Sequence, residues 1–165
     1  MKHEAEKIDY SGWQLFVSIF LRVLIGWHFL YEGLFKIYTP GWTSEEYLLG
    51  AVGPLTPLFS GMAQSETLLN IIDIFNECEL IIIGLSLFLG LFSNPLILAG
   101  IFLLSLYYLS YPLFPGLQVN ACLEGNYRIV NKNLFEMASL FVLFLFPSSH
   151  ITGFDGFIFK KKKVD

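Results

Sequence analysis

Apolar residues in this chain gather in four long runs, separated by shorter stretches that hold prolines, glycines and charged residues. The runs cover about residues 13–38, 70–92, 95–111 and 129–146. A helix needs about 20 mainly apolar residues to cross the hydrocarbon core of a bilayer. Helices are the expected form, because in hydrocarbon each segment must satisfy its own backbone polar groups. The pattern therefore predicts an all-α membrane protein, a single domain built as a bundle of four transmembrane helices.

Two further apolar segments are predicted to lie at the membrane surfaces. Residues 47–62, YLLGAVGPLTPLFSGM, are too apolar for an ordinary solvated loop, and three glycines and two prolines prevent a long helix. This composition predicts a re-entrant or interfacial lid on the outer face of the bundle. Residues 151–159 place Ile151, Phe154 and Ile158 at helical spacing before a run of lysines, which is typical of a short interfacial anchor.

Composition agrees with the membrane interpretation. Of the 165 residues, 55% are hydrophobic and only 15% are charged, with a mean hydropathy of +0.60. Average soluble domains have about 25% charged residues, so this chain lacks the polar surface that a water-soluble globule needs. The lysines at 160–163 form the only basic cluster. A run so short beside a membrane segment does not favour nucleic-acid binding.

The lysine run also predicts the orientation in the membrane. Lysine and arginine are enriched in cytoplasmic segments, and four spans put both termini on one side. We therefore expect both termini in the cytoplasm of a multi-pass inner (plasma) membrane protein, with residues 39–69 and 112–130 outside. The first of these loops contains three glutamates and no lysine or arginine, which agrees with that side.

Ionisable residues occur inside every predicted span except the third, which contributes tyrosines. A charge near the bilayer centre costs about 2.5–3.5 kcal/mol on insertion scales, so each one needs a partner or a function. Counting about 1.5 Å per residue from the ends of the spans places these groups in one layer, from the midplane outward. The candidate ligand-binding or proton-relay residues are Arg22, His28, Glu32, Lys36, Glu77, Glu79, Tyr108 and Glu136.

The first span presents two adjoining rows of residues. Arg22, Gly26, Phe29 and Gly33 share one stripe, with Lys36 at its edge. The two glycines allow a neighbouring helix or a flat ligand to approach closely. His28, Glu32 and Lys36 form a second row at i, i+4 and i+8. Because Arg22 and Glu79 fall at nearly the same depth, we expect them to form an ion pair.

The polar layer has two interpretations. Buried ion pairs and hydrogen bonds can fix the register of the helices, and this explains the expected pair of Arg22 and Glu79 as well as a functional role does. The whole set exceeds what four short helices need for that purpose. It favours a pocket, open to the outer side or to lipid, that holds a polar headgroup and moves protons.

Redox and metal chemistry of the chain's own residues is not indicated. Cys78 and Cys122 form neither a C-x-x-C motif nor a metal-ligand spacing, and two unrelated free thiols are the simpler interpretation. The histidines, at positions 3, 28 and 150, do not match a haem or iron–sulfur site. A small transporter or a thiol-redox partner that uses Cys122 on the outer side is the weakest alternative, since no second thiol is near Cys122 in the sequence.

The order of these motifs resembles the DoxX family of small four-helix membrane proteins. The first span contains R-V-L-I-G-W-H-F-L-Y-E-G-L-F-K, residues 22–36, and the second contains E-L-I-I-I-G-L-S-L-F-L-G-L-F, residues 79–92. The third span follows with L-L-S-L-Y-Y-L-S-Y-P, and G-F-D at residues 153–155 is similar to the G-L-D near the C-terminus of many members. The resemblance covers nearly the whole chain through motifs that are individually loose.

The resemblance implies a link to quinone and thiol redox complexes, because the family is named after a subunit associated with thiosulfate:quinone oxidoreductase. A quinone-facing role would fall on Arg22, Lys36 and Glu79, which match family positions, whereas His28 and Glu32 rest on the residue pattern alone. Electrons would have to come from a partner subunit, or the protein is no oxidoreductase by itself. The expected partners are the lipid membrane and other membrane or periplasmic subunits, or further copies of the chain in a homo-oligomer. The alternative, from a different class, is a non-catalytic assembly or scaffold subunit whose buried charges are structural.

Overall fold

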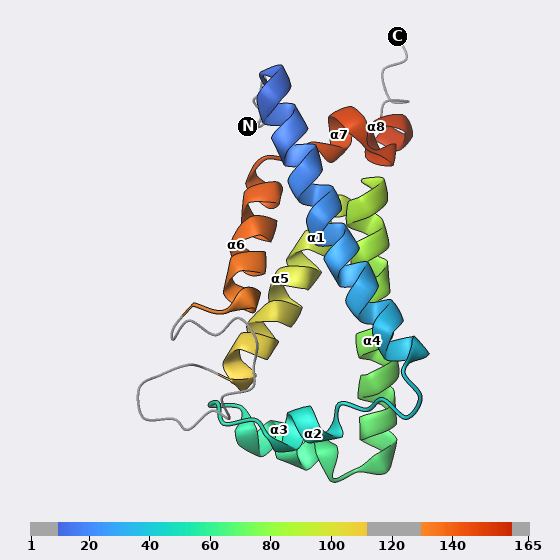
Figure 1. Ribbon diagram of the computed structural model, residues 1–165, viewed down its shortest axis with the longest axis vertical. Helices are drawn as coiled ribbons and strands as arrows, with labels where there is room; N and C mark the ends of the chain where they lie inside the picture. Colours follow the sequence, from blue (N-terminus) through green and yellow to red (C-terminus); the bar gives the residue numbers. More distant parts are fainter. Residues whose placement is uncertain (1–9, 112–129, 160–165) are drawn as a thin grey trace, which may run out of the picture.

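The computed structural model describes residues 10–111 and 130–159 of the chain. About 80% of these residues are helical and none lies in a strand, so the chain is all-α, as its pattern predicts. The helices of the described part are α1 (Gly12–Tyr38), α2 (Glu45–Leu49), α3 (Thr56–Ala63), α4 (Glu66–Leu89), α5 (Ser93–Ser110), α6 (Lys132–Leu145), α7 (Ser149–Thr152) and α8 (Phe154–Phe159) (Figure 1).

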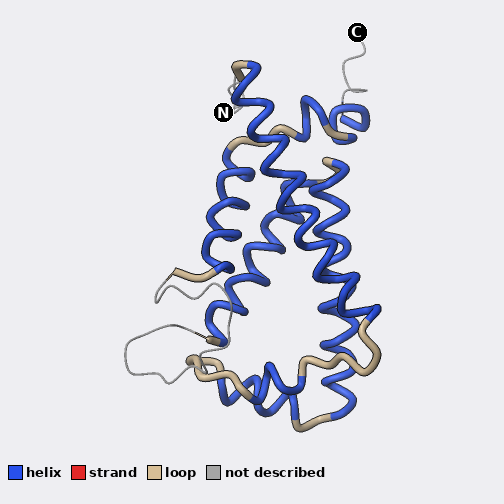
Figure 2. The backbone as a smooth tube through the Cα atoms, in the orientation of Figure 1, coloured by secondary structure: helices blue, strands red, loops and turns tan. Residues whose placement is uncertain are grey.

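The four longest helices run along the long axis of the molecule, and the short ones close its two ends. Helices α2 and α3 lie across the end where α4 begins, while α7 and α8 lie across the end where α1 begins (Figures 1 and 2). Helix α1 packs against α4, and α5 packs against α6 and α4. Towards α2 and α3 the long helices diverge, with α1 and α4 on one side and α5 on the other (Figure 2).

Glycines set the register between α1 and α4. A Cβ atom on Gly84 would lie only 2.5 Å from the backbone nitrogen of Leu30, and one on Gly26 would lie 2.9 Å from that of Phe88. A Cβ atom on Gly33 would lie 2.8 Å from the Ile81 side chain. The two backbones therefore approach as closely as small residues permit. The expected role of these glycines as helix contacts is confirmed.

Two apolar cores hold the elements together. The larger core lies between the four long helices and consists of Phe29, Leu80, Ile83, Leu87, Ile97, Leu103, Leu104, Leu140 and Leu143. The smaller core lies under α2 and α3 and consists of Leu48, Ala51, Phe59, Ala63 and Leu69. Residues 47–62 thus form a folded cap with its own core, a more regular structure than its glycines and prolines suggest.

Several helix boundaries differ from the apolar runs. Helix α4 begins at Glu66, four residues before the run at 70, because polar residues in its first turn extend beyond the apolar stretch. Helix α5 begins at Ser93 and not at Pro95, since a proline in the first turn lacks only a hydrogen bond that no helix makes there. The predicted single anchor at 151–159 is divided at Gly153 into α7 and α8.

Of the four predicted spans, α1 and α5 are long and apolar enough over the described residues to be candidate membrane spans. Helix α4 contains Glu66, Asp73, Glu77 and Glu79, and α6 has only 14 residues. The loop at 112–129 and the lysines at 160–163, on which the predicted orientation depends, lie outside the described residues.

Candidate functional site

The predicted polar layer is divided into three groups of side chains. One surrounds Lys36 at the end covered by α2 and α3, and a second joins α1 to α6. The third surrounds Arg22, which precedes Lys36 on α1 by 14 residues, or about 21 Å along the helix. The structure therefore does not bring Arg22 and Lys36 together in one cluster, and their expected common layer in the membrane stays a prediction.

Lys36 extends from α1 towards α4 and the loop that follows α1. Its Nζ atom donates a hydrogen bond of 2.5 Å to Oδ1 of Asn76. The same atom lies 4.6 Å from the ring centre of Trp42 and 5.8 Å from that of Tyr107, within the range of cation–π attraction. No carboxylate of the described residues lies within ion-pair distance of Lys36, although the charges of Glu32 and Glu77 act on it from farther away. A neutral amide and two aromatic faces therefore hold this ammonium group.

Tyrosines extend the same cluster from α5 to α2. The Asn76 amide donates to the Tyr107 hydroxyl, and the Tyr47 hydroxyl donates to the Tyr107 carbonyl at 3.2 Å. The Tyr111 hydroxyl donates to the Tyr47 carbonyl at 2.7 Å, and the two rings meet edge to face with centres 4.8 Å apart. Burial raises the pKa of the Tyr47 phenol above its ordinary value, so this group is a neutral hydrogen-bond donor at physiological pH. We call Lys36, Trp42, Asn76, Tyr47 and Tyr107 the lysine–aromatic cluster.

Asp73 of α4 is bound to the cap formed by α2 and α3. Its Oδ1 atom accepts hydrogen bonds from the backbone nitrogen of Ser44, at 3.0 Å, and from the Ser44 hydroxyl. Ser44 is the residue directly before α2, so this carboxylate fixes where the cap begins. The partners of Asp73 indicate a structural role.

A chain of charged groups joins α1 to α6. His28 Nε2 lies 3.0 Å from Glu136 Oε1 and 3.9 Å from Glu32 Oε1, and Lys132 Nζ lies 3.2 Å from the same oxygen of Glu32. The expected row of His28, Glu32 and Lys36 is therefore interrupted, because Lys36 turns to α4 while Glu32 turns to α6. Tyr108, another predicted candidate, is half-buried on α5.

Glu77 and Glu79 lie half-exposed on α4, and Glu79 does not pair with Arg22. The expected ion pair is wrong because it was inferred only from the estimated depth of the two residues in the membrane. The glycine contacts put Gly33 opposite Leu80 and Ile81, which leaves Arg22 opposite Gly90, where a Cβ atom would lie 2.9 Å from Arg22 Nη1. Glu79 is thus eleven residues away from the position that Arg22 faces.

Asp155, in the G-F-D motif, closes the end of the molecule near Arg22. Its carboxylate accepts hydrogen bonds from the backbone nitrogens of Phe92, at 2.7 Å, and Ser93, at 3.3 Å, and its own nitrogen donates to the Gly90 carbonyl at 2.9 Å. These bonds hold Phe92 at its unusual φ of 50°, in the tight turn between α4 and α5. Gly153 lies directly on Gly90, where a Cβ atom on either residue would come within 2.7 Å of the other.

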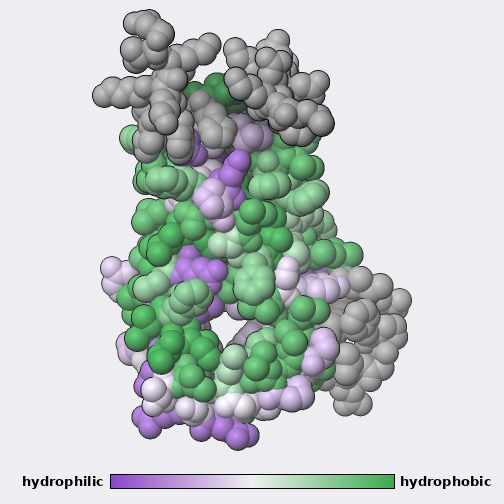
Figure 3. Space-filling model, turned by 180° about the vertical axis from the view of Figure 1, so that it is seen from behind, coloured by the Kyte–Doolittle hydropathy of each residue, from purple (hydrophilic) through white to green (hydrophobic). Residues whose placement is uncertain are grey.

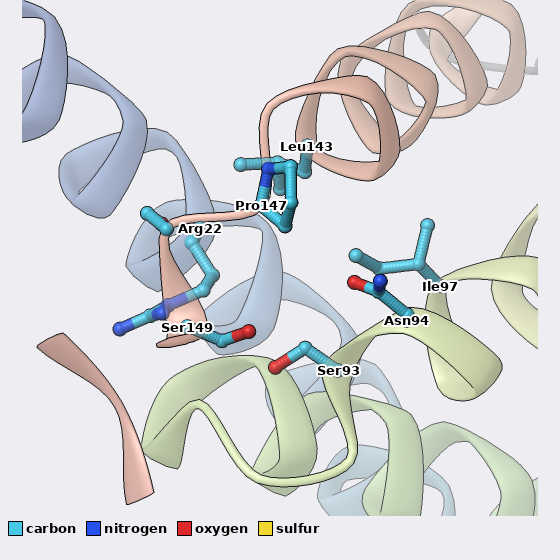
Figure 4. Close-up of a pocket in the computed structure, with 8 residues that line it drawn as sticks. Arg22, Ser93, Asn94, Ile97, Leu143, Pro147 and Ser149 are labelled. Carbon is cyan, nitrogen blue, oxygen red and sulfur yellow. The ribbon is translucent and has the colours of Figure 1, made fainter. Parts of the chain in front are cut away.

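A small polar cavity lies beside Arg22. It is lined by residues of α1, α5 and the segment from α6 to α7, which are Arg22, Ser93, Asn94, Ile97, Leu143, Pro147, Ser148 and Ser149 (Figure 4). Its volume of about 10 Å³ is that of one water molecule. This space is too small for a quinone headgroup as it stands, so the structure gives no observation that supports a headgroup at Arg22.

Sequence reasoning missed the contributions of the cap and of the C-terminal segment. Trp42, Ser44 and Tyr47 belong to the segment between α1 and α4, where the available signal was its apolar and aromatic content. The only sequence signal for Asp155 was the G-F-D motif at residues 153–155. Among residues 10–111 and 130–159, no group of three or more histidine, cysteine, aspartate or glutamate side chains is placed to hold a metal ion. Cys78 is exposed on α4, and Cys122 lies outside the described residues.

Comparison of the chain with protein families, curated proteins and solved structures found no match in any of the three.

Proposed function

We propose that this chain is an integral membrane subunit that binds the headgroup of a quinone-like isoprenoid ligand and serves a membrane redox complex. The observation that carries the proposal is the state of Lys36, a half-buried ammonium group with a neutral amide and aromatic rings as its neighbours. A charge placed in this way lacks a carboxylate in contact with it, and a ligand oxygen carrying negative charge would supply one.

The outer surface of the helices supports insertion in a membrane. Large apolar side chains are exposed on all four long helices, among them Trp27 on α1, Phe75 on α4, Phe102 on α5 and Phe141 on α6, each at least 54% exposed. Figure 3 shows this surface as largely hydrophobic, with polar residues in a few patches. An apolar surface of this extent needs a lipid or protein partner. Since α4 and α6 lie alongside α1 and α5, we propose that all four helices cross the bilayer.

We propose that α7 and α8 lie at the cytoplasmic side and that α2 and α3 form a lid at the outer side. The lysine run that follows α8 supports this orientation. The lysine–aromatic cluster is then in the outer half of the membrane. In Figure 3 the face seen from behind is hollowed in its lower half, above α2 and α3, which is the end at which the cluster lies.

The cluster offers the groups that a quinone headgroup requires. Lys36 donates to one carbonyl oxygen and stabilises the negative charge that develops there on reduction. The Trp42 and Tyr107 rings provide flat apolar faces beside it. Reduction of a quinone to a quinol takes two electrons, which a partner subunit supplies, and two protons, for which Glu77, Glu79 and the His28–Glu136 pair are candidate carriers. The resemblance to the DoxX family supports the same role.

A scaffold subunit is the second candidate, and one observation favours it. Most charged groups of the polar layer already have partners, as the contacts of Asp73 with Ser44, His28 with Glu136 and Lys132 with Glu32 show. In that case the layer only fixes the arrangement of the helices.

The test is a pair of lysine variants in the purified protein. Lys36→Met removes the charge and keeps the aliphatic stem, and Lys132→Met is the matched control on an exposed lysine. We expect Lys36→Met to weaken binding of a short-chain quinone analogue about tenfold or more, as loss of a charged hydrogen bond does, with little change in melting temperature. Lys132→Met should leave binding unchanged. Absence of binding in the unmodified protein, together with a large stability loss in Lys36→Met, would favour the scaffold.

A further inference from the structure

The hydrogen bonds of the lysine–aromatic cluster run in one direction, from α1 through α4 to α5. Lys36 donates to Oδ1 of Asn76, and Nδ2 of Asn76 donates to the hydroxyl oxygen of Tyr107. An ammonium group has donors only, so the oxygen of the Asn76 amide must face Lys36. The amide nitrogen then faces Tyr107, and because this nitrogen also only donates, the phenol oxygen has to accept. The charge of Lys36 therefore fixes the direction of both hydrogen bonds.

The hydroxyl hydrogen of Tyr107 is left available to a ligand. Its oxygen accepts from Asn76, and within the described part of the chain no acceptor is hydrogen-bonded to this hydroxyl. The neighbouring tyrosines differ, because the hydroxyl of Tyr47 donates to the Tyr107 carbonyl and that of Tyr111 donates to the Tyr47 carbonyl. Of these three tyrosines, Tyr107 is therefore the one whose donor is not already used.

A ligand that reaches Tyr107 meets a second donor in Lys36. The ammonium group has three hydrogens and uses one of them on Asn76. The side chains of Lys36, Asn76 and Tyr107 are half-buried, and Figure 3 shows the molecule hollowed at this end. The carboxylates of Glu32 and Glu79 act on Tyr107 through their charge, and neither is hydrogen-bonded to it. The groups that remain available at this point of the cluster are therefore donors.

We propose that Tyr107 and Lys36 recognise the acceptor oxygens of the ligand, so that the site binds an oxidised quinone more tightly than the corresponding quinol. This inference rests on the quinone function proposed above and specifies which redox form the site selects. A quinone carbonyl oxygen accepts from these donors. In the quinol both oxygens carry a hydrogen, and a hydroxyl hydrogen that meets donors in place of an acceptor stays unpaired, which weakens binding. Tyr107 is then a specificity-determining residue of the site.

The first experiment measures two dissociation constants for the unmodified full chain in detergent. The probes are a short-chain alkyl benzoquinone and the matching hydroquinone, which is kept reduced under argon. We expect the quinone to bind about tenfold more tightly than the hydroquinone. Equal affinities, or a preference for the hydroquinone, would overturn this inference and leave the proposed function standing. Absence of binding by both probes would overturn the two together.

The second experiment assigns the preference to Tyr107. Tyr107→Phe keeps the ring and removes the hydroxyl, and Asn76→Asp replaces the amide nitrogen by an oxygen, to which the Tyr107 hydroxyl then donates. Both variants should reduce the preference for the quinone to about threefold or less. Tyr111→Phe is the matched control and should leave the ratio of the two affinities unchanged, because its hydroxyl is already bound to the Tyr47 carbonyl. A preference that both variants retain in full would overturn the assignment. If Tyr107→Phe fails to fold, the nearly isosteric Asn76→Asp decides the question.

Discussion

At the scale of single residues, the charged side chains inside the bundle differ in the chemical groups that surround them. Arg22 lies against Gly90 and is attracted by a carboxylate that does not touch it, Lys36 lies beside an amide and aromatic rings, and Asp155 accepts hydrogen bonds from backbone nitrogens. The sequence identified Arg22 and Lys36 as unusual, because charges in apolar runs stand out. It could not identify their neighbours, since these come from other helices, from the loop after α1 and from the C-terminal segment, whose positions depend on the folded chain.

Asp155→Asn should destabilise the protein by about 1.5–3 kcal/mol, because it weakens both charged hydrogen bonds to the backbone of the α4–α5 turn. The measurement is the free energy of unfolding in detergent. Glu46→Gln is the control, as its side chain is exposed on α2 and makes no contact across the fold that the structure gives. Equal stability of Asp155→Asn and Glu46→Gln would show that the C-terminal segment does not hold the turn.

At the scale of elements, apolar runs predict where helices occur, and small residues decide how the helices meet. The four runs correspond to α1, α4, α5 and α6, with boundary errors where polar first turns or a proline extend a helix beyond its apolar part. The register between α1 and α4 could not be obtained from depth counting, because contacts such as that of Gly84 with Leu30 fix it locally. This is why the pairing of Arg22 with Glu79 was wrong.

Gly84→Ala should destabilise the protein by about 1–3 kcal/mol, the usual cost of overpacking. Its new methyl group would lie 2.5 Å from the backbone nitrogen of Leu30, which cannot move aside as a side chain can, so α1 and α4 must separate. Gly61→Ala in α3 is the matched control, with open space around the new methyl group. This control should be neutral or slightly stabilising, because alanine favours a helix more than glycine does. A comparison of the two unfolding curves tests the argument, and equal effects would refute it.

At the scale of the whole molecule, the two ends differ in construction. One end carries the cap with its own apolar core, and the other carries the short C-terminal helices over the α4–α5 turn (Figure 1). We propose that these ends face opposite sides of the membrane. The sequence predicted both segments from their apolar residues and expected them at opposite faces, and the folded chain places them at opposite ends of the bundle (Figure 1).

Cysteine labelling in intact cells tests this arrangement. In a background of Cys78→Ser and Cys122→Ser, a cysteine replacing Gly61 on α3 should react with a membrane-impermeant thiol reagent added outside. A cysteine replacing Gly12 at the start of α1 should react only after the membrane is permeabilised. Both positions have open space for a side chain, so neither substitution should disturb packing. The reverse pattern of labelling would invert the proposed orientation.

The cap has a mechanical consequence for ligand binding. It is anchored to α4 through Asp73 and Ser44 and to α5 through Tyr47 and Tyr111, which are helices that diverge at this end. Because it is bonded to both helices, the cap holds the ends of α4 and α5 apart when no ligand is present. A planar molecule reaching the cluster would find its position already formed, and little binding energy would be lost in rearranging the protein. Affinity at this site would then depend on how firmly the cap is held to α4 and α5.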